Sequence, residues 1–416
     1  MLIKRDLYLQ RLINRQNNGM IKVITGLRRA GKTYILFELF YSYLKEQGID
    51  DSHIIKIALD DRRNSKFLNP DYLCDYVYNL VSDDKMYYIL LDEVQLVPDF
   101  ESVLNSFLHT KNLDVYVTGS NAKFLSKDII TEFRGRGDEV KVYPLSFSEY
   151  LSATQKDKFT ALNEYMTYGG LPYVASLNSH EQIVSYLTNL FTETYIKDIE
   201  NRYSIKNKQE LKDIFNILAS GIGSFTSNTK LANSFKSIKS KTISDVTIGK
   251  YVDYIQDSFL IEGVAKYDVK GKKYINSPKK YYFTDLGLRN AMLNFRQIEP
   301  THAMENIIYN QLKIMGFSVD IGNLQIVERQ KDKVVRKDCE IDFVANLGSK
   351  RYYIQSAYSM PTQEKMEQEQ RSLKNISDSF KKIIITQDCP SIHYNEDGIL
   401  IMSIYDFLLN EESIKF

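Results

Sequence analysis

The pattern of apolar and polar positions changes several times along the chain. Short apolar runs without turn residues predict buried parallel strands at 21–25, 87–91 and 115–118. The stretch 34–40 instead carries apolar residues three and four apart, and so does much of 159–201, which predicts amphipathic helices. Strands that alternate with helices predict an α/β fold with a parallel sheet, followed by a smaller helical segment.

A different order of elements is expected after residue 205. The pattern predicts helices at 208–219, 228–235 and 245–259, then short strands at 260–267 and 279–283. Three helices followed by a hairpin outline a winged helix. A helix at 303–312 and strands at 340–345 and 352–357 predict a final α/β domain. The expected domains are therefore 1–150, 151–205, 206–295 and 296–416.

The segment between the first strand and the first helix has the chemistry of a phosphate-binding loop. It reads Gly26-Leu27-Arg28-Arg29-Ala30-Gly31-Lys32-Thr33, which is the Walker A spacing in its strand, loop and helix context. Gly26 and Gly31 let backbone N–H groups face a phosphate, and the helix N-terminus adds partial positive charge. Lys32 is predicted to contact the β- and γ-phosphates of ATP, and Thr33 to bind Mg²⁺. The alternative is a plain turn between strand and helix.

Two adjacent carboxylates, Asp92 and Glu93, follow the apolar strand at 87–91. The C-terminal ends of strands are where an α/β sheet keeps its ligands. We expect Asp92 to hold Mg²⁺, directly or through water, and Glu93 to orient or deprotonate the attacking water. This pair, about 60 residues after the Walker A loop, fits a Walker B motif.

Polar and basic groups follow the third strand. Ser120 or Asn121 is predicted to hold the attacking water or touch the γ-phosphate, and the alternative is an N-cap for the next helix. Farther on, Arg136 is the first candidate for an arginine finger and Arg134 the second, because a guanidinium presents its charge as a planar fork. Solvated or ion-paired arginines are the alternative. A finger that acts in trans would require a homo-oligomer.

The chain resembles the prokaryotic AAA-type ATPases that carry an uncharacterised C-terminal domain. Besides the two Walker motifs, the resemblance rests on Thr118-Gly119-Ser120, Gly135-Arg136-Gly137, Pro144-Leu145-Ser146-Phe147-Ser148-Glu149-Tyr150 and Tyr168-Gly169-Gly170-Leu171-Pro172. The last of these is similar to the Gly-x-Pro element that STAND-type signalling ATPases place near adenine. The resemblance thus implies a P-loop ATPase core, a helical lid over 151–205, and a nucleotide contact at Pro172. A simple interhelical turn is the alternative for this last segment.

The charge of the expected winged helix is uneven. The whole chain has a formal net charge of only +1, so it exerts no general attraction on nucleic acid. Lysines gather at 230, 236, 239, 241 and 250, and in the hairpin at 266, 270, 272, 273, 279 and 280. We expect Lys270, Lys272 and Lys273 to contact DNA phosphates. The third helix offers few side chains for reading base edges. A solvated face or a protein-docking winged helix is the alternative.

The last domain resembles the restriction-endonuclease-like nucleases, whose motif ends in Asp or Glu, any residue, then Lys. Glu305 and Asp342 match two of its acidic positions, but Gln355 and Ala357 stand where the acid and the lysine belong. An amide is a poorer Mg²⁺ ligand than a carboxylate, and alanine has no charge. We therefore expect a nuclease-like fold without cleavage. The structural alternative is that Glu305 caps a helix and Asp342 pairs with a nearby lysine.

Composition sets the remaining limits. The chain has 416 residues, of which 43% are hydrophobic and 26% charged, which describes a globular protein of several domains. No apolar run approaches the ~20 residues of a membrane span, and the N-terminus lacks a signal-peptide pattern, so we expect a cytoplasmic protein. The overall hypothesis is an ATP- and Mg²⁺-dependent ATPase that couples its nucleotide state to the winged-helix and nuclease-like modules, with DNA as a candidate partner. The alternative is an ATP-gated regulatory or defence-linked switch that binds a protein partner and turns over little.

Overall fold

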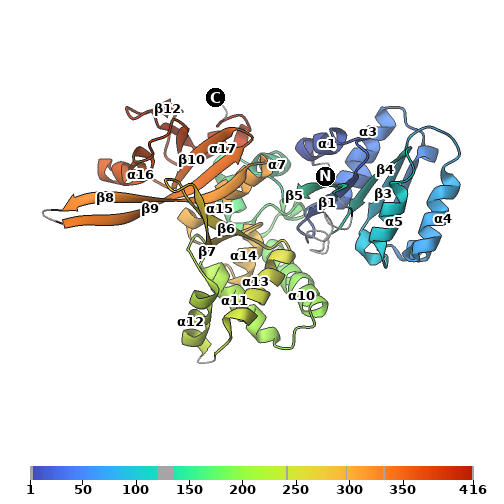
Figure 1. Cartoon of the computed structure of the whole chain (residues 1–416), viewed down its shortest axis with the longest axis horizontal. Helices are drawn as coiled ribbons and strands as arrows, with labels where there is room; N and C mark the ends of the chain where they lie inside the picture. Colours follow the sequence, from blue (N-terminus) through green and yellow to red (C-terminus); the bar gives the residue numbers. More distant parts are fainter. Residues whose placement is uncertain are drawn as a thin grey trace. The chain divides into compact units, whose positions relative to one another are not determined.

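The computed structural model describes residues 3–119, 133, 135–239, 242–296, 298–330 and 333–414. The chain divides into two compact units (Figure 1). The first comprises Met1–Pro144 with Asp257–Phe259, and the second comprises Leu145–Gln256 with Leu260–Phe416. Among the described residues, no helix has the length and apolar character needed to cross a membrane.

The first unit is built on a five-stranded sheet in the order β2-β3-β4-β1-β5, and every neighbouring pair is parallel. Its strands are β1 Ile21–Gly26, β2 Ile54–Ala58, β3 Tyr87–Asp92, β4 Leu113–Thr118 and β5 Gly137–Val142. Its helices are α1 Asp6–Ile13, α2 Lys32–Tyr34, which continues through Ile35–Phe40 into α3 Tyr41–Glu46, then α4 Pro70–Leu80 and α5 Phe100–Phe107. The predicted parallel α/β sheet is confirmed.

Helices on both sides explain why the central strands read as apolar runs. Every residue of β1 and β3 is buried, which is the pattern of a parallel strand covered on both faces. Burial extends to Lys22 in β1, whose ammonium forms an ion pair with Asp114 of β4. Asn69 caps the N-terminus of α4 by accepting a hydrogen bond from the Tyr72 N–H at 2.9 Å.

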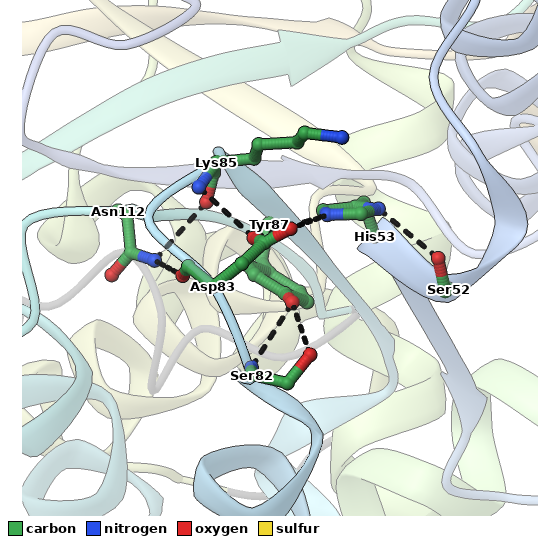
Figure 2. A network of polar contacts seen from close by, with 7 residues as sticks. All are labelled: Ser52, His53, Ser82, Asp83, Lys85, Tyr87 and Asn112. Carbon is green, nitrogen blue, oxygen red and sulfur yellow. Dashed lines mark hydrogen bonds and ion pairs between the residues drawn. The ribbon is translucent and has the colours of Figure 1, made fainter.

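A polar network holds the loop that leads into β3 (Figure 2). The imidazole of His53 lies 3.2 Å from the Asp83 carboxylate, and the Tyr87 hydroxyl accepts a hydrogen bond from the Ser82 N–H at 3.1 Å. The Asn112 side chain donates to the backbone oxygens of Asp83 and Lys85, both at 3.0 Å. These residues lie where the parallel strands begin, so the network supports the loops at the edge opposite the strands' C-terminal ends.

The second unit contains an eight-stranded sheet in the order β12-β13-β11-β10-β9-β8-β6-β7. Its strands are β6 Ile261–Asp268, β7 Lys273–Phe283, β8 Ser318–Gln330, β9 Lys333–Leu347, β10 Lys350–Ala357, β11 Lys381–Thr386, β12 His393–Tyr394 and β13 Leu400–Ser403. Its helices are α7 Phe147–Thr154, α8 Lys158–Tyr168, α9 His180–Asn189, α10 Lys197–Arg202, α11 Lys208–Ser220, α12 Asn228–Lys239, α13 Asp245–Asp257, α14 Leu286–Met292, α15 Pro300–Ile314, α16 Gln363–Lys374 and α17 Ile404–Leu409. A π-helical segment, Leu190–Ile196, joins α9 to α10.

Three helices, α11 to α13, precede the antiparallel hairpin β6–β7, which is the order that the sequence predicts. The hairpin also pairs with the strands that follow it, because β6 runs parallel to β8 at Lys266–Asp268. One sheet therefore crosses the expected domain boundary at 295–296. Beyond this pairing, β8 and β9 continue as a long two-stranded arm (Figure 1).

A buried aspartate joins the Gly-Gly-Leu-Pro segment to α14. The Asp285 carboxylate accepts hydrogen bonds from the Gly170 N–H at 2.8 Å and the Leu288 N–H at 3.0 Å. Burial raises the pKa of Asp285 to about 6, although these backbone N–H groups favour its charged form. A Cβ at Gly169 would lie 2.3 Å from the same carboxylate. This close packing gives Gly169 a structural reason to be glycine.

Candidate nucleotide site

The loop between β1 and α2 adopts the curled shape that its glycines permit. Gly26 has φ +127°, and a Cβ there would lie 2.0 Å from the backbone oxygen of Val142 in β5. Gly31, directly before α2, has φ +95°, and Arg29 between them has φ +66°. Glycine adopts positive φ without the steric cost of a side chain. The backbone of the loop is therefore concave and ends at a helix N-terminus, which is the arrangement of an anion-binding site.

The Lys32 side chain lies inside this loop. It is 5% exposed, and its Nζ donates hydrogen bonds to the backbone oxygens of Gly26 at 3.0 Å and Leu27 at 3.1 Å. Burial lowers the pKa of Lys32 to about 8, although the Glu93 and Asp92 carboxylates favour the ammonium. The cation is therefore held where its charge is poorly solvated, and a phosphate would stabilise it.

The predicted Mg²⁺ ligands Thr33 and Asp92 meet, although 59 residues separate them. The Thr33 hydroxyl lies 2.9 Å and 3.1 Å from the two Asp92 carboxylate oxygens. Burial raises the pKa of Asp92, and hydrogen bonds from Thr118 and Thr33 oppose this shift. A hydroxyl and a carboxylate beside a phosphate loop are the oxygen donors that Mg²⁺ takes in P-loop proteins. The residues present thus fit a magnesium nucleotide.

Glu93 and Thr118 complete the tip of the sheet. Glu93 has left-handed backbone angles, φ 56° and ψ 45°, an uncommon conformation for a residue other than glycine. Its N–H donates to the Thr118 hydroxyl at 3.0 Å, and that hydroxyl also bonds Asp92. The Gln95 side chain donates to the Glu93 carboxylate. The sequence pattern assigns Thr118 no role, because a single hydroxyl at the end of an apolar strand has no distinctive signature.

The structure places Arg136 at the edge of the sheet where β1 begins, and its role as an arginine finger remains a prediction. Its backbone oxygen accepts a hydrogen bond from the Ile21 N–H at 2.9 Å, and Ile21 pairs with Gly137. Arg136 therefore lies beside the start of β1, whereas the phosphate loop begins at its end. Five residue steps along a strand span about 17 Å. The exposed Arg136 side chain cannot reach the phosphate site of its own chain, so a finger role would require a second copy.

The roles of four other candidate residues remain predictions. Ser120, Asn121 and Arg134 lie outside the described residues. Pro172 is half-buried in the second unit, directly after the segment that Asp285 holds. Its expected contact with the base is untested.

The fold and this site define an AAA-type P-loop ATPase domain. Residues 18–151 match the AAA domain family. Residues 159–299 match a domain family of unknown function, which spans the helices from α8 to α14 together with the hairpin β6–β7.

A relative matches almost the whole chain. An uncharacterised protein of Haemophilus influenzae is 31% identical over 98% of this chain and 99% of its own length. The chain belongs to the family of this protein. An uncharacterised protein of Methanocaldococcus jannaschii is 28% identical over 97% of this chain and 88% of its own length.

Solved structures are more distant. The Aeropyrum pernix Orc1 protein in complex with DNA is 12% identical, covers 71% of this chain and 93% of its own, and has a TM-score of 0.28. Cdc6p of Pyrobaculum aerophilum is 10% identical, covers 70% and 95%, and has a TM-score of 0.30. Scores this low support no inference about function.

In the C-terminal region, the structure brings Glu305 and Asp342 together with Lys280, which the sequence pattern places among the lysines of the candidate DNA-binding surface. Lys280 of β7 is 3% exposed, and its Nζ lies 2.9 Å from the Glu305 carboxylate and also contacts Glu340. Three carboxylates outweigh burial and raise the pKa of Lys280. Burial and the Glu305 charge raise the pKa of Asp342 well above its usual value. Lys280 is thus a buried ion-pair partner, which corrects its assignment to a phosphate-binding surface.

Gln355 makes polar contacts with α16, and Ala357 packs in the core. The Gln355 side chain lies 3.4 Å from the Glu369 carboxylate of α16 and 3.5 Å from the Ser372 hydroxyl. Ala357 is 2% exposed within an apolar cluster. Glu305 lies within α15 rather than at its cap, so the expectation that it caps a helix is wrong.

We predict that Lys280→Met destabilises the second unit by about 3–5 kcal/mol, because it leaves Glu305 buried without its cation. Chemical denaturation monitored by circular dichroism measures this loss. Lys279→Met is the matched control, since Lys279 is half-buried and pairs with Thr226 through its backbone alone. Equal stability of the two variants would contradict the assigned ion pair.

The pKa of Lys32 predicts that nucleotide affinity depends on pH. A phosphate favours the ammonium, so binding raises a pKa that is about 8 in the free protein. Affinity should be constant up to about pH 8 and fall above it by at most about tenfold per pH unit, because binding then requires proton uptake. Titrations with a fluorescent ATP analogue up to about pH 9.5 measure the profile. An unchanged affinity across this range would contradict the shifted pKa.

Proposed function

We propose that this protein is an AAA-type ATPase that hydrolyses ATP with Mg²⁺ and couples its nucleotide state to the second unit. The observation that carries the proposal is the joint placement of Lys32, Thr33 and Asp92 at the curled loop. Lys32 would balance the β- and γ-phosphate charge, and Thr33 and Asp92 would hold the metal. Mg²⁺, when bound, neutralises charge that develops on the phosphate oxygens.

Glu93 is the residue that we assign to the attacking water. Its carboxylate follows Asp92 at the end of β3, and the Thr118 hydroxyl fixes its backbone by accepting its N–H at 3.0 Å. Gln95 restrains the carboxylate in the described state, so Glu93 would have to exchange this bond for water. An Arg136 finger supplied by a second copy would add positive charge to the same site.

We further propose that α11 to α13 and the hairpin β6–β7 act as a winged helix that contacts DNA phosphates. The hairpin turn exposes Lys270, Lys272 and Lys273, and the adjacent Tyr274 is 60% exposed. Lysines beside an exposed aromatic ring suit nucleic acid of any sequence. The nuclease-like domain would then bind without cutting, because Gln355 and Ala357 supply neither the acid nor the lysine of the nuclease motif.

A protein partner is the second candidate, and the surface of α13 favours it. This third helix exposes Asp245, Asp253 and Val246, the last at 70%, and carries Lys250 as its only basic residue. An acidic helix with an exposed apolar residue would be repelled by a phosphate backbone. In this case ATP would hold one conformation of a regulatory switch, and turnover would be slow.

ATP turnover measured without DNA, with double-stranded DNA and with single-stranded DNA, at two salt concentrations, tests the proposal. Stimulation by DNA that declines with salt supports the DNA-coupled ATPase. Tight ATP binding with slow turnover that no DNA changes supports the switch. Absence of ATP binding would refute both.

The lysine turn gives a sharper prediction. Replacing Lys270, Lys272 and Lys273 with alanine should weaken binding to any duplex and reduce the slope of log affinity against log salt by about 0.9 for each lost contact. Alanine at Lys66, Lys85 and Lys111, three exposed lysines of the first unit, removes the same charge as a control. An unchanged slope in the hairpin variant would point to protein docking instead.

A further inference from the structure

A buried arginine ahead of the nucleotide loop touches both the loop and the end of the first unit. Arg5 precedes α1 and is 1% exposed. Its Nη1 donates to the backbone oxygen of Ala30 at 3.0 Å, and its Nη2 donates to that of Tyr143 at 2.8 Å. Ala30 lies inside the phosphate loop, and Tyr143 lies one residue before the end of the first unit at Pro144.

The bond to Ala30 bears directly on phosphate binding. In a trans peptide the C=O and the following N–H point in opposite directions. Because Arg5 fixes the oxygen of Ala30, it also fixes the N–H of Gly31 on the other side of that peptide plane. Ala30 is fully buried, so its oxygen has no access to water as a replacement partner. Loss of the guanidinium would leave this oxygen unsatisfied and the loop free to rotate.

The bond to Tyr143 belongs to a second set of contacts at the end of β5. The Tyr143 N–H donates to the Tyr8 hydroxyl at 3.1 Å, and the Arg5 guanidinium lies 4.6 Å from the centre of the Tyr8 ring. The loop also touches β5 directly, because Gly26 pairs with Val142 and has no room for a Cβ against it. A movement of the loop would therefore displace residues 142–144 in two ways. One is the direct backbone contact between Gly26 and Val142, and the other is the pair of hydrogen bonds that Arg5 donates to Ala30 and Tyr143.

We propose that Arg5 is a positioning residue that holds the phosphate loop in its binding shape and transmits the nucleotide state to the connection at 143–144. This inference rests on the proposed ATPase function, because it concerns the same site. Arg5 itself donates to one backbone oxygen of the loop, that of Ala30, and does not touch the reacting atoms. The planar guanidinium suits this task, since one side chain reaches two carbonyl groups, one in the loop after β1 and the other directly after β5.

Two variants and one control test the proposal in the full-length protein. Arg5→Met removes the donors and keeps an unbranched apolar chain, whereas Arg5→Lys keeps the charge without the planar fork. Arg11→Met is the control, because the Arg11 guanidinium lies 5.3 Å from the same Tyr8 ring and belongs to α1, the helix that Arg5 precedes. Thermal unfolding and circular dichroism establish that each variant is folded.

The first readout is ATP affinity. We expect Arg5→Met to raise the dissociation constant at least about tenfold, since it unpairs a buried backbone oxygen. Arg5→Lys should lie between this variant and the wild type, and Arg11→Met should match the wild type. Should Arg5→Met fail to fold, Arg5→Lys decides the outcome. A wild-type affinity in the folded Arg5 variants would overturn the inference.

The second readout is hydrogen exchange at saturating ATP, which a merely structural role would not change selectively. In the wild type, ATP should slow exchange in peptides that cover 26–33 and 139–146. In Arg5→Met the first peptide should still respond, and the response of the second should be clearly smaller than in the wild type, because only the Gly26–Val142 contact remains. An undiminished response at 139–146 would refute transmission through Arg5. If the wild-type protein binds no ATP, the proposed ATPase function itself is refuted. If it binds ATP and the Arg5 variants behave like the wild type, only the positioning role is refuted.

Discussion

Lys32→Ala should abolish tight ATP binding. The ammonium lies inside the phosphate loop at 3.0 Å from the Gly26 oxygen, and no other described lysine lies in that loop. Truncating one partner of a buried charge pair typically costs 2–5 kcal/mol, so the dissociation constant should rise roughly a hundredfold or more. Equilibrium binding of a fluorescent ATP analogue measures the change.

The control for this variant is Lys22→Ala, which removes a buried lysine of β1, the strand that leads into the loop. Lys22 pairs with Asp114, away from the loop. Its loss should lower stability, and the folded fraction should bind ATP as the wild type does. Equal ATP affinity of Lys32→Ala and wild-type protein would remove the loop from its assigned role.

Glu93→Gln should preserve ATP binding and slow hydrolysis. The amide keeps the shape of the side chain, and Thr33 and Asp92 remain to hold the metal. An amide cannot accept a proton from water, and loss of a general base typically reduces the rate about 10²–10⁴-fold. Single-turnover hydrolysis with bound nucleotide measures the chemical step apart from binding.

Gln95→Ala serves as the matched variant for Glu93→Gln, because it removes the hydrogen bond from Gln95 and leaves the Glu93 carboxylate in place. Hydrolysis by Gln95→Ala should equal or exceed that of the wild type. A wild-type rate of hydrolysis in Glu93→Gln would show that another residue is the general base. The neighbouring Thr118 could not replace Glu93 in this role, because its hydroxyl could only orient water.

Much of the nucleotide site could be predicted from short segments of the sequence. The loop from Gly26 to Thr33 and the pair Asp92-Glu93 were identified from spacing and from their place after apolar strands. Parallel strands bring such residues to one edge of the sheet, and the structure accordingly brings Thr33 within 2.9 Å of Asp92. Thr118 was missed because a single hydroxyl at a strand end has no distinctive pattern. Its role as a bridge between Asp92 and Glu93 depends on β3 and β4 being neighbours.

The sequence could not decide which basic residues of the hairpin are exposed to solvent. Lysines 270, 272, 273 and 280 all belong to this hairpin, yet the first three are exposed and Lys280 is buried among carboxylates. The direction of β5 likewise sets Arg136 at the edge opposite the phosphate loop. Charge patterns give the number of charges in a segment, but not which face of a sheet or which end of a strand receives each one.

The amino-acid sequence by itself determined the parallel α/β core, the phosphate loop and the acidic pair, because these features depend on residues close together along the chain. Only the tertiary structure showed that Arg5 donates a hydrogen bond to the loop, that Lys280 forms an ion pair with Glu305, and that one sheet joins the hairpin to the C-terminal strands. The physical reason is that buried charges must find partners. Those partners come from strands and helices far away in sequence, whose neighbours are fixed by the packing of the whole sheet.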